Sequence, residues 1–145
     1  MDLAISSEKI GNPLLVELLR KLTDSFNKMN KEFYVIGAAV CVALIGKDTV
    51  HYAWQGNVRL HKIDNGNYQL LTTDHIVNCG CTTLLTRCIN GKGFREPIPV
   101  ESVSTDRGNI IYLCSDGYYQ STNNMQSQLP ANLSDDASMI EIIFE

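Results

Sequence analysis

The chain has 145 residues, of which 44% are hydrophobic and 19% charged, the size and composition of one globular domain. A net charge of −4 without a basic run argues against a nucleic-acid binder, and no apolar stretch approaches the ~20 residues of a membrane span. The first residues lack the pattern of a secretory signal, and five cysteines suit reduced thiols better than a disulfide framework. We therefore expect a single cytoplasmic domain over residues 1–145, with neither nucleic acid nor membrane as a partner.

The first predicted element is an amphipathic helix beginning at Asn12-Pro13, where asparagine serves as the N-cap and proline occupies the first helical position. Apolar residues then recur every three or four positions along one face: Leu14, Leu15, Leu18, Leu19, Leu22, Phe26 and Met29. Polar side chains fill the opposite side. We expect this helix to pack through one face only.

A run of strands is predicted next. Phe33–Ile45 is almost continuously apolar, which favours a central strand covered on both faces. Thr49–Gln55 and Val58–Ile63 predict two further strands, and Asp64-Asn65-Gly66 is typical of a hairpin that returns into Tyr68–Leu71. The short connections favour antiparallel pairing of adjacent strands.

The second half of the chain predicts fewer elements. A short helix is expected at Thr83–Cys88, before a segment broken by glycines and prolines. Asn109–Cys114 and Ala137–Phe144 predict strands, and the polar stretch Gln120–Gln128 is expected to loop out between them. The whole pattern indicates an α+β domain, an antiparallel β-sandwich with flanking helices.

Two acidic turns, Asp116-Gly117 and Asp135-Asp136, lie next to these last two strands, and we expect them to meet at neighbouring strand ends. Paired carboxylates suit hard cations such as Mg²⁺ or Mn²⁺, which take oxygen ligands and keep several waters. Aspartate is also common in ordinary turns, so the residues alone favour two plain turns over a metal site.

A zinc site is a second metal hypothesis, because His75, Cys79, Cys81 and Cys88 cluster in the sequence. Their spacing fits no standard structural zinc pattern, and packed thiols are the simpler interpretation. Aromatic side chains are expected in the core or on sheet faces, rather than as a stacking platform: Trp54, Tyr112, Tyr118 and Tyr119.

Six short segments, read in order, resemble successive motifs of the metal-dependent protein phosphatases (the PPM, or type 2C, family): Gly37–Ile45, Ala53–Arg59, Leu71–His75, Leu85–Arg87, Ile110–Gly117 and Ser134–Ile140. The family hydrolyses phosphoserine and phosphothreonine with two metal ions, on a fold of two antiparallel sheets between helices, in α-β-β-α layers. By position, the resemblance implies that Asp116 (with Gly117) and Asp135 (with Asp136) are metal ligands. It implies Mg²⁺ or Mn²⁺ as the cofactor.

The chain departs from the family pattern in its first residues and at one internal position. The family's bridging ligand is an Asp-Gly pair on an early strand, and an upstream arginine grips phosphate. Here Asp2, followed by Leu3, is the only stand-in and a weaker metal candidate. The family's central Gly-Asp pair is Gly56-Asn57. We therefore expect an N-terminally truncated, divergent member that lacks the first strands and the shared ligand needed to hold two metals.

Three functions follow as hypotheses. The first is a phosphatase-like domain, impaired as a lone chain, that acts by binding or regulation; it would bind a phosphoprotein or another protein, or self-associate through open sheet edges. The second is an active Mg²⁺- or Mn²⁺-dependent serine/threonine phosphatase whose missing ligands come from another chain, or from Asp2 and Glu8. The third is a plain structural module.

Overall fold

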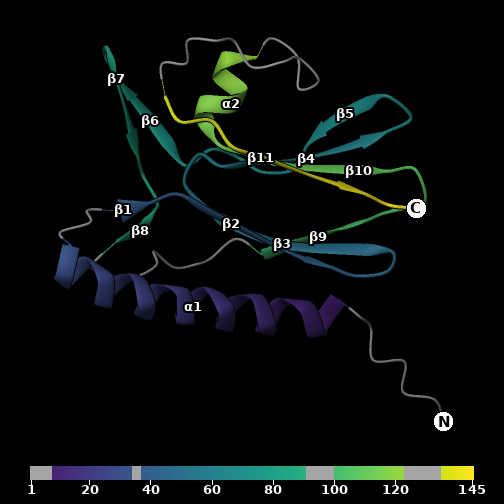
Figure 1. The fold of residues 1–145 in the computed structure, drawn as a ribbon, viewed down its shortest axis with the longest axis horizontal. Coiled ribbons are helices and arrows are strands. Elements are labelled where there is room, and N and C mark those ends of the chain that lie inside the picture. The colour runs from purple at the N-terminus through teal and green to yellow at the C-terminus, as the bar shows by residue number, and fades with distance from the viewer. Residues whose placement is uncertain (1–7, 34–36, 91–99, 123–134) are drawn as a thin grey trace.

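The computed structural model describes residues 8–33, 37–90, 100–122 and 135–145. Figure 1 shows a long helix, α1 (Glu8–Phe33), beneath two layers of strands, with a short helix, α2 (Asp116–Ser121), above them. The layer order is therefore helix, sheet, sheet, helix, which confirms the predicted α+β sandwich. None of the helices in the described ranges is long and apolar enough to cross a membrane.

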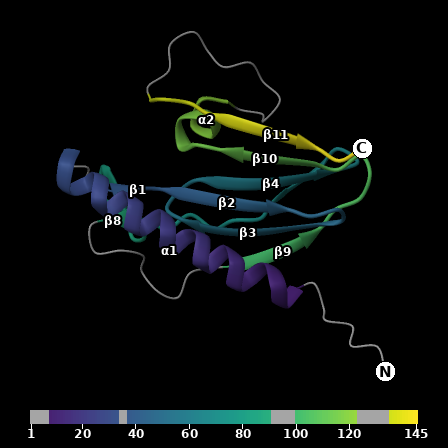
Figure 2. The ribbon, with the colours of Figure 1, turned by 60° about the horizontal axis from the view of Figure 1, so that its bottom comes forward.

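Helix α1 lies across the outer face of one sheet (Figure 2). Leu15 and Leu19 are fully buried there and pack with Ala53 of the sheet. The helix begins at Glu8, so the predicted N-cap at Asn12 is wrong; Pro13 is the sixth residue of the helix, where it has no N–H to donate to the helical ladder. The predicted apolar face is also wider than the buried one, because four of its members are exposed: Leu14, Leu18, Leu22 and Met29.

The sheet that α1 covers has the strand order β2-β3-β9, formed by Val40–Ile45, Thr49–Gln55 and Val100–Ser104. β3 is its central strand and is buried from Val50 to Gln55. The prediction of one central strand over Phe33–Ile45 is wrong in position. β2 is an edge strand among the described strands, although α1 and the second sheet cover its two faces, and Gly37–Ala38 forms a separate strand, β1.

The second sheet has the order β11-β10-β4-β5, formed by Met139–Ile143, Ile110–Cys114, Arg59–Asp64 and Asn67–Leu70. The β4–β5 hairpin is confirmed: it turns at Asn65-Gly66, both with positive φ (49° and 80°). Strands β10 and β11 also lie where the sequence predicted them.

Strands β3 and β4 are consecutive but belong to different sheets, so the expected pairing of adjacent strands fails at this point. The chain crosses the sandwich at Gly56, which has φ +105°. A Cβ at Gly56 would overlap the Ala39 side chain, so only glycine fits both this conformation and this close approach. The crossing brings Asn57 and Arg59 to the end of the second sheet.

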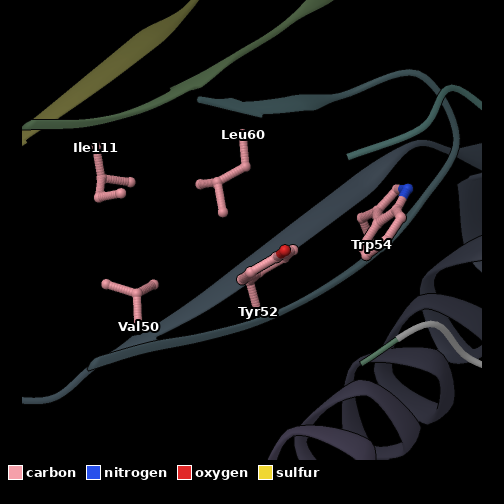
Figure 3. Close-up of a cluster of buried hydrophobic side chains, with 5 residues drawn as sticks. All are labelled: Val50, Tyr52, Trp54, Leu60 and Ile111. Atoms are coloured by element: carbon pink, nitrogen blue, oxygen red, sulfur yellow. The ribbon is translucent and has the colours of Figure 1, made fainter. Parts of the chain in front are cut away.

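The core lies between the two sheets (Figure 3). Three alternate residues of β3, Val50, Tyr52 and Trp54, face Leu60 of β4 and Ile111 of β10. Leu60, Val50 and Ile111 are completely buried, so this cluster fixes the spacing of the sheets.

A hairpin of β6 (Ile76–Cys79) and β7 (Thr82–Leu85) projects away from the sandwich (Figure 1). The predicted helix at Thr83–Cys88 is wrong: β7 is a strand, which suits its β-branched threonines and the two-residue turn before it. The short strand β8 (Ile89–Asn90) then pairs with β1.

Candidate functional site

A cavity of about 570 Å³ opens at the end of the second sheet, between α2 and the β6–β7 hairpin. The turn before β4, strand β4, the loop after β5, the hairpin and α2 each contribute side chains to it. The lining residues are Asn57, Arg59, Asp74, Ile76, Thr83, Leu85, Asp116, Tyr119 and Gln120. Five of them carry strongly polar groups, so the cavity is suited to a charged ligand rather than an apolar one.

Arg59 is the cation of this cavity and is held on two sides. Its Nε and Nη2 donate to the two carboxylate oxygens of Asp74, at 3.1 and 2.8 Å. Its guanidinium also lies 3.7 Å from the ring centroid of Tyr119. The bidentate bond to Asp74 raises the pKa of Arg59, so this cation is permanently charged and already paired.

Tyr119 closes the other side of Arg59 and contacts the crossing turn. Its hydroxyl donates to the Asn57 carbonyl at 2.9 Å. Burial, and then the charge of Asp74, raise the pKa of Tyr119 to about 12. The phenol therefore stays protonated near neutral pH and acts here as a donor.

Asp116 starts α2 directly after β10, and both of its oxygens have partners. Oδ2 accepts from Asn57 Nδ2 at 2.8 Å, and Oδ1 accepts from the backbone N–H of Gly117 at 3.0 Å. The partner of Oδ2 is a neutral amide, which contributes no charge to a metal and competes for the oxygen that would bind one.

The second acidic turn lies beside the first, as the sequence predicted. Cys114 pairs with Met139 at the end of the β10–β11 ladder, so the chains leaving these residues run next to one another. A Cβ at Gly117 would overlap the carbonyl oxygen of Asp136, so only glycine permits this approach. Asp135 Oδ1 accepts from the Asp136 N–H at 2.8 Å, and both aspartates are exposed. Their role as metal ligands stays a prediction, and Asp2 lies outside the described residues.

These residues fit one loosely held hard cation better than a two-metal centre. Asp116 and Asp135 would contribute two carboxylates, the kind of ligand that Mg²⁺ or Mn²⁺ accepts together with several waters. Within the described part of the chain, no group of three His, Cys, Asp or Glu side chains is placed to hold a metal ion. A pair of ions roughly 3.5–4 Å apart needs a shared ligand, and these ranges provide none.

The zinc hypothesis finds no assembled site in these same ranges. His75 Nδ1 accepts from the Gly56 N–H at 3.1 Å, and its ring stacks on Trp54 with centroids 5.9 Å apart. Cys79 and Cys81 are exposed at the tip of the β6–β7 hairpin, so the interpretation of these two as packed thiols is wrong.

Sequence reasoning missed three site residues. Arg59 and Asp74 lie within segments that resemble the phosphatase motifs. Their opposite charges could have indicated that the two side chains pair. Tyr119 was expected in the core or on a sheet face, but it lines the cavity; its spacing of three residues from Asp116 on a helix places both on one side.

Solved structures share this arrangement at low sequence identity. A serine/threonine phosphatase of S. agalactiae aligns with a TM-score of 0.68 at 17% identity, over 83% of this chain and 56% of its own. A Stage II Sporulation E family protein from Thermanaerovibrio acidaminovorans aligns with a TM-score of 0.64 at 16% identity, over 89% and 78% of the two chains. The chain has the PPM phosphatase fold.

The PPM fold is confirmed at the level of architecture. The catalytic domain of the serine/threonine phosphatase PstP, in complex with two manganese ions, aligns with a TM-score of 0.61 at 16% identity, over 77% of this chain and 54% of that domain. The chain thus spans little more than half the length of this domain and of the S. agalactiae enzyme. No protein-family model matches the sequence, and no curated protein matches it. A shared fold at such identity leaves activity to be argued from the site.

Proposed function

We propose that this chain is a divergent PPM-type phosphatase-like domain, catalytically impaired as a lone chain, that acts by binding or regulation. The observation that carries the proposal is the hydrogen bond from Asn57 Nδ2 to Asp116 Oδ2. Asp116, with Gly117, is the carboxylate of the cavity that matches the family's Asp-Gly pattern. Its Oδ2 is hydrogen-bonded to a neutral amide. The chain would therefore keep the family's pocket while lacking the family's metal chemistry.

Phosphate ester hydrolysis needs an activated water and neutralisation of charge on the phosphoryl oxygens. A bound Mg²⁺ or Mn²⁺ would supply a Lewis acid for those oxygens, and Asp116 and Asp135 would hold it. Arg59 is neutralised by Asp74 and Tyr119 holds its proton, so neither offers a base that would activate water. The charged side chains that line the cavity, Arg59, Asp74 and Asp116, are net negative, so binding of a phosphate group there would depend on that metal ion.

The partners we propose are a phosphoprotein at the cavity, and a protein chain or a second copy at the open sheet edges. Edge strand β11 exposes two of its isoleucines, Ile140 by 60% and Ile143 by 55%. An apolar recess of about 190 Å³ lies between Cys41 of β2 and Ile140 of β11. Two edge strands bordering one apolar recess favour addition of a strand from a partner. The five cysteines are free, which suits a reducing compartment such as the cytoplasm.

The alternative is an active Mg²⁺- or Mn²⁺-dependent serine/threonine phosphatase whose missing ligands come from another chain. Asp116 favours it, because this residue lies in the cavity at the end of β10 and retains the family's Asp-Gly pair. The PstP catalytic domain is in complex with two manganese ions, which supports Mn²⁺ as the cofactor of this alternative.

A hydrolysis assay separates the two functions. The full chain is incubated with an aryl phosphate and a phosphothreonine peptide, with Mn²⁺ and without it, beside the Asp116→Asn variant. We expect the same background rate in all samples, together with binding of the uncleaved phosphopeptide in a calorimetric titration. Turnover that requires Mn²⁺ and disappears in Asp116→Asn would establish the alternative. An absence of both turnover and phosphopeptide binding would leave the sheet edges as the binding site.

A further inference from the structure

The tip of the β6–β7 hairpin carries two exposed cysteines. Neither the fold nor the proposed function accounts for them. Cys79 and Cys81 flank Gly80, and both side chains are exposed. Cys79 is the last residue of β6 and pairs with Thr82, so the turn consists of Gly80 and Cys81 alone. Two thiols are therefore presented to solvent on either side of one glycine.

A two-residue turn keeps the Cα atoms of these cysteines within the range that a disulfide requires. A disulfide requires Cα atoms about 4.4–6.8 Å apart. Residues two apart in a chain are separated by at most about 7 Å, and a tight turn shortens that distance. Gly80 has φ 64°, the value for the first central residue of a type II′ turn. Glycine adopts this positive φ without steric cost.

We propose that Cys79 and Cys81 form a reversible dithiol–disulfide couple that exchanges with small-molecule thiols and disulfides such as glutathione. The thiolate of one cysteine attacks a sulfur of oxidised glutathione, and one glutathione thiolate leaves. The second cysteine attacks the protein sulfur of this mixed disulfide, and the second glutathione leaves. The protein pair loses two electrons and two protons, and one glutathione disulfide becomes two thiols.

The other cysteines provide contrasts within the same chain. Burial raises the pKa of Cys41 to about 12 and that of Cys114 to about 11, which keeps both as unreactive thiols. Cys88 is half-buried and its sulfur lies 3.9 Å from Asn90 Nδ2. Oxidation should therefore be confined to the hairpin tip.

The couple also has a place in the site. Ile76, Thr83 and Leu85 of the same hairpin line the cavity, and Thr83 is only two residues from Cys81. A bond across Gly80 changes the end of the β6–β7 ladder and hence the support of one cavity wall. Disulfides in reducing compartments are typically transient and redox-sensing, which matches an exposed pair in this position.

Thiol mapping tests the couple independently of any phosphatase-like activity. The full chain is equilibrated in glutathione buffers of increasing oxidised fraction, quenched with acid, labelled with a maleimide and digested for mass spectrometry. We expect labelling of Cys79 and Cys81 to fall together at least tenfold, with a peptide two hydrogens lighter, and dithiothreitol to restore both labels. Labelling of Cys41 and Cys114 under denaturing conditions should stay complete.

Single variants distinguish this bond from other oxidation products. Cys79→Ser and Cys81→Ser should each stop at one glutathione adduct on the remaining thiol, and Cys88→Ser should leave the paired oxidation unchanged. The proposal is overturned if both tip thiols stay labelled in fully oxidised glutathione. It is equally overturned if they become linked to Cys88 or to a second chain instead of to each other.

Discussion

Asn57 donates its side-chain amide to the carboxylate of Asp116 at 2.8 Å, across 59 residues of sequence. The bond joins the crossing between the two sheets to the start of α2, and it decides what this cavity can hold. An aspartate in place of Asn57 would put a second negative charge where the amide now satisfies the first.

We expect Asn57→Asp to raise the affinity for Mn²⁺ at least tenfold, because a third carboxylate adds to those of Asp116 and Asp135. Without metal, the two adjacent carboxylates repel, and the variant should lose about 1–3 kcal/mol of unfolding free energy. Calorimetric titration with Mn²⁺ and urea denaturation measure the two effects. Asn57→Ser is the matched control, since it removes the amide without adding charge. Equal Mn²⁺ affinity in Asn57→Asp and the wild type would contradict a metal site beside residue 57 and Asp116.

The Arg59–Asp74 pair should matter for stability far more than the surface ion pair of α1. Arg59→Met leaves Asp74, whose side chain is only 13% exposed, without its bidentate partner, and we expect a loss of about 1–3 kcal/mol. Arg59→Lys should recover only part of it, since a single ammonium replaces a fork of donors. Lys21→Met breaks the exposed Glu17–Lys21 pair and should leave the urea midpoint unchanged. Similar losses in Arg59→Met and Lys21→Met would contradict this ranking.

Strand β11, the outermost strand of its sheet within the described ranges, leads to a prediction about assembly. If β11 pairs with a second copy, Ile140→Glu should shift the protein towards monomer by at least tenfold in dissociation constant, because Ile140 is exposed at the edge and adjoins the apolar recess. Light scattering after gel filtration measures this directly. Ile45→Glu on β2 is the companion variant at the other edge. A wild type that stays monomeric at high concentration would rule out self-association and leave a different protein as the partner.

Stability should fall on mild acidification. Burial, followed by the charges of Arg59 and Arg87, lowers the pKa of His61 and of His75 below the ordinary value of 6.5. The unfolded chain therefore binds more protons below that pH, so the stabilisation is complete above about pH 6.5 and is lost as pH falls through the folded-state pKa. Urea midpoints between pH 7.5 and 5.5 should decline.

A double variant separates the contribution of the two histidines to the pH dependence from that of the carboxylates, which also titrate at acid pH. His61→Gln with His75→Asn keeps a polar side chain at each position, and the second change retains an acceptor for the Gly56 N–H. We expect a flatter decline between pH 7.5 and 5.5 than in the wild type. An identical decline would assign the acid sensitivity to other groups.

Much of the fold could be read from local patterns, and the failures have physical causes. The β4–β5 hairpin followed from Asn65-Gly66, because few residues adopt positive φ at two consecutive positions. The start of α1 was misplaced because Asn12-Pro13 is typical of a helix start, whereas this helix already begins at Glu8 and continues through Pro13, which lacks the N–H of the helical ladder. The position of β2 at an edge depends on which strands lie beside it, and no pattern within Phe33–Ile45 carries that information.

The site was predictable only in part. Aspartates next to strands β10 and β11 could be paired from the strand ends, since antiparallel neighbours bring those ends together. The contacts of Arg59 with Asp74 and Tyr119 join three separate segments, and those of Asn57 with Asp116 join two. Such contacts depend on the crossing at Gly56. The residues next to each partner in the sequence do not indicate that the chain crosses there.

Trp54 is the single tryptophan of the chain, and its contacts make it an optical probe of the site. Its indole N–H donates to the Thr73 carbonyl at 2.8 Å, next to Asp74, and its ring stacks on His75. Intrinsic fluorescence thus originates from one place, between the core and the loop that holds Arg59. Because a charged imidazole quenches indole emission, the protonation of His75 and any movement of this loop on ligand binding should be visible in the untouched protein, with no label attached.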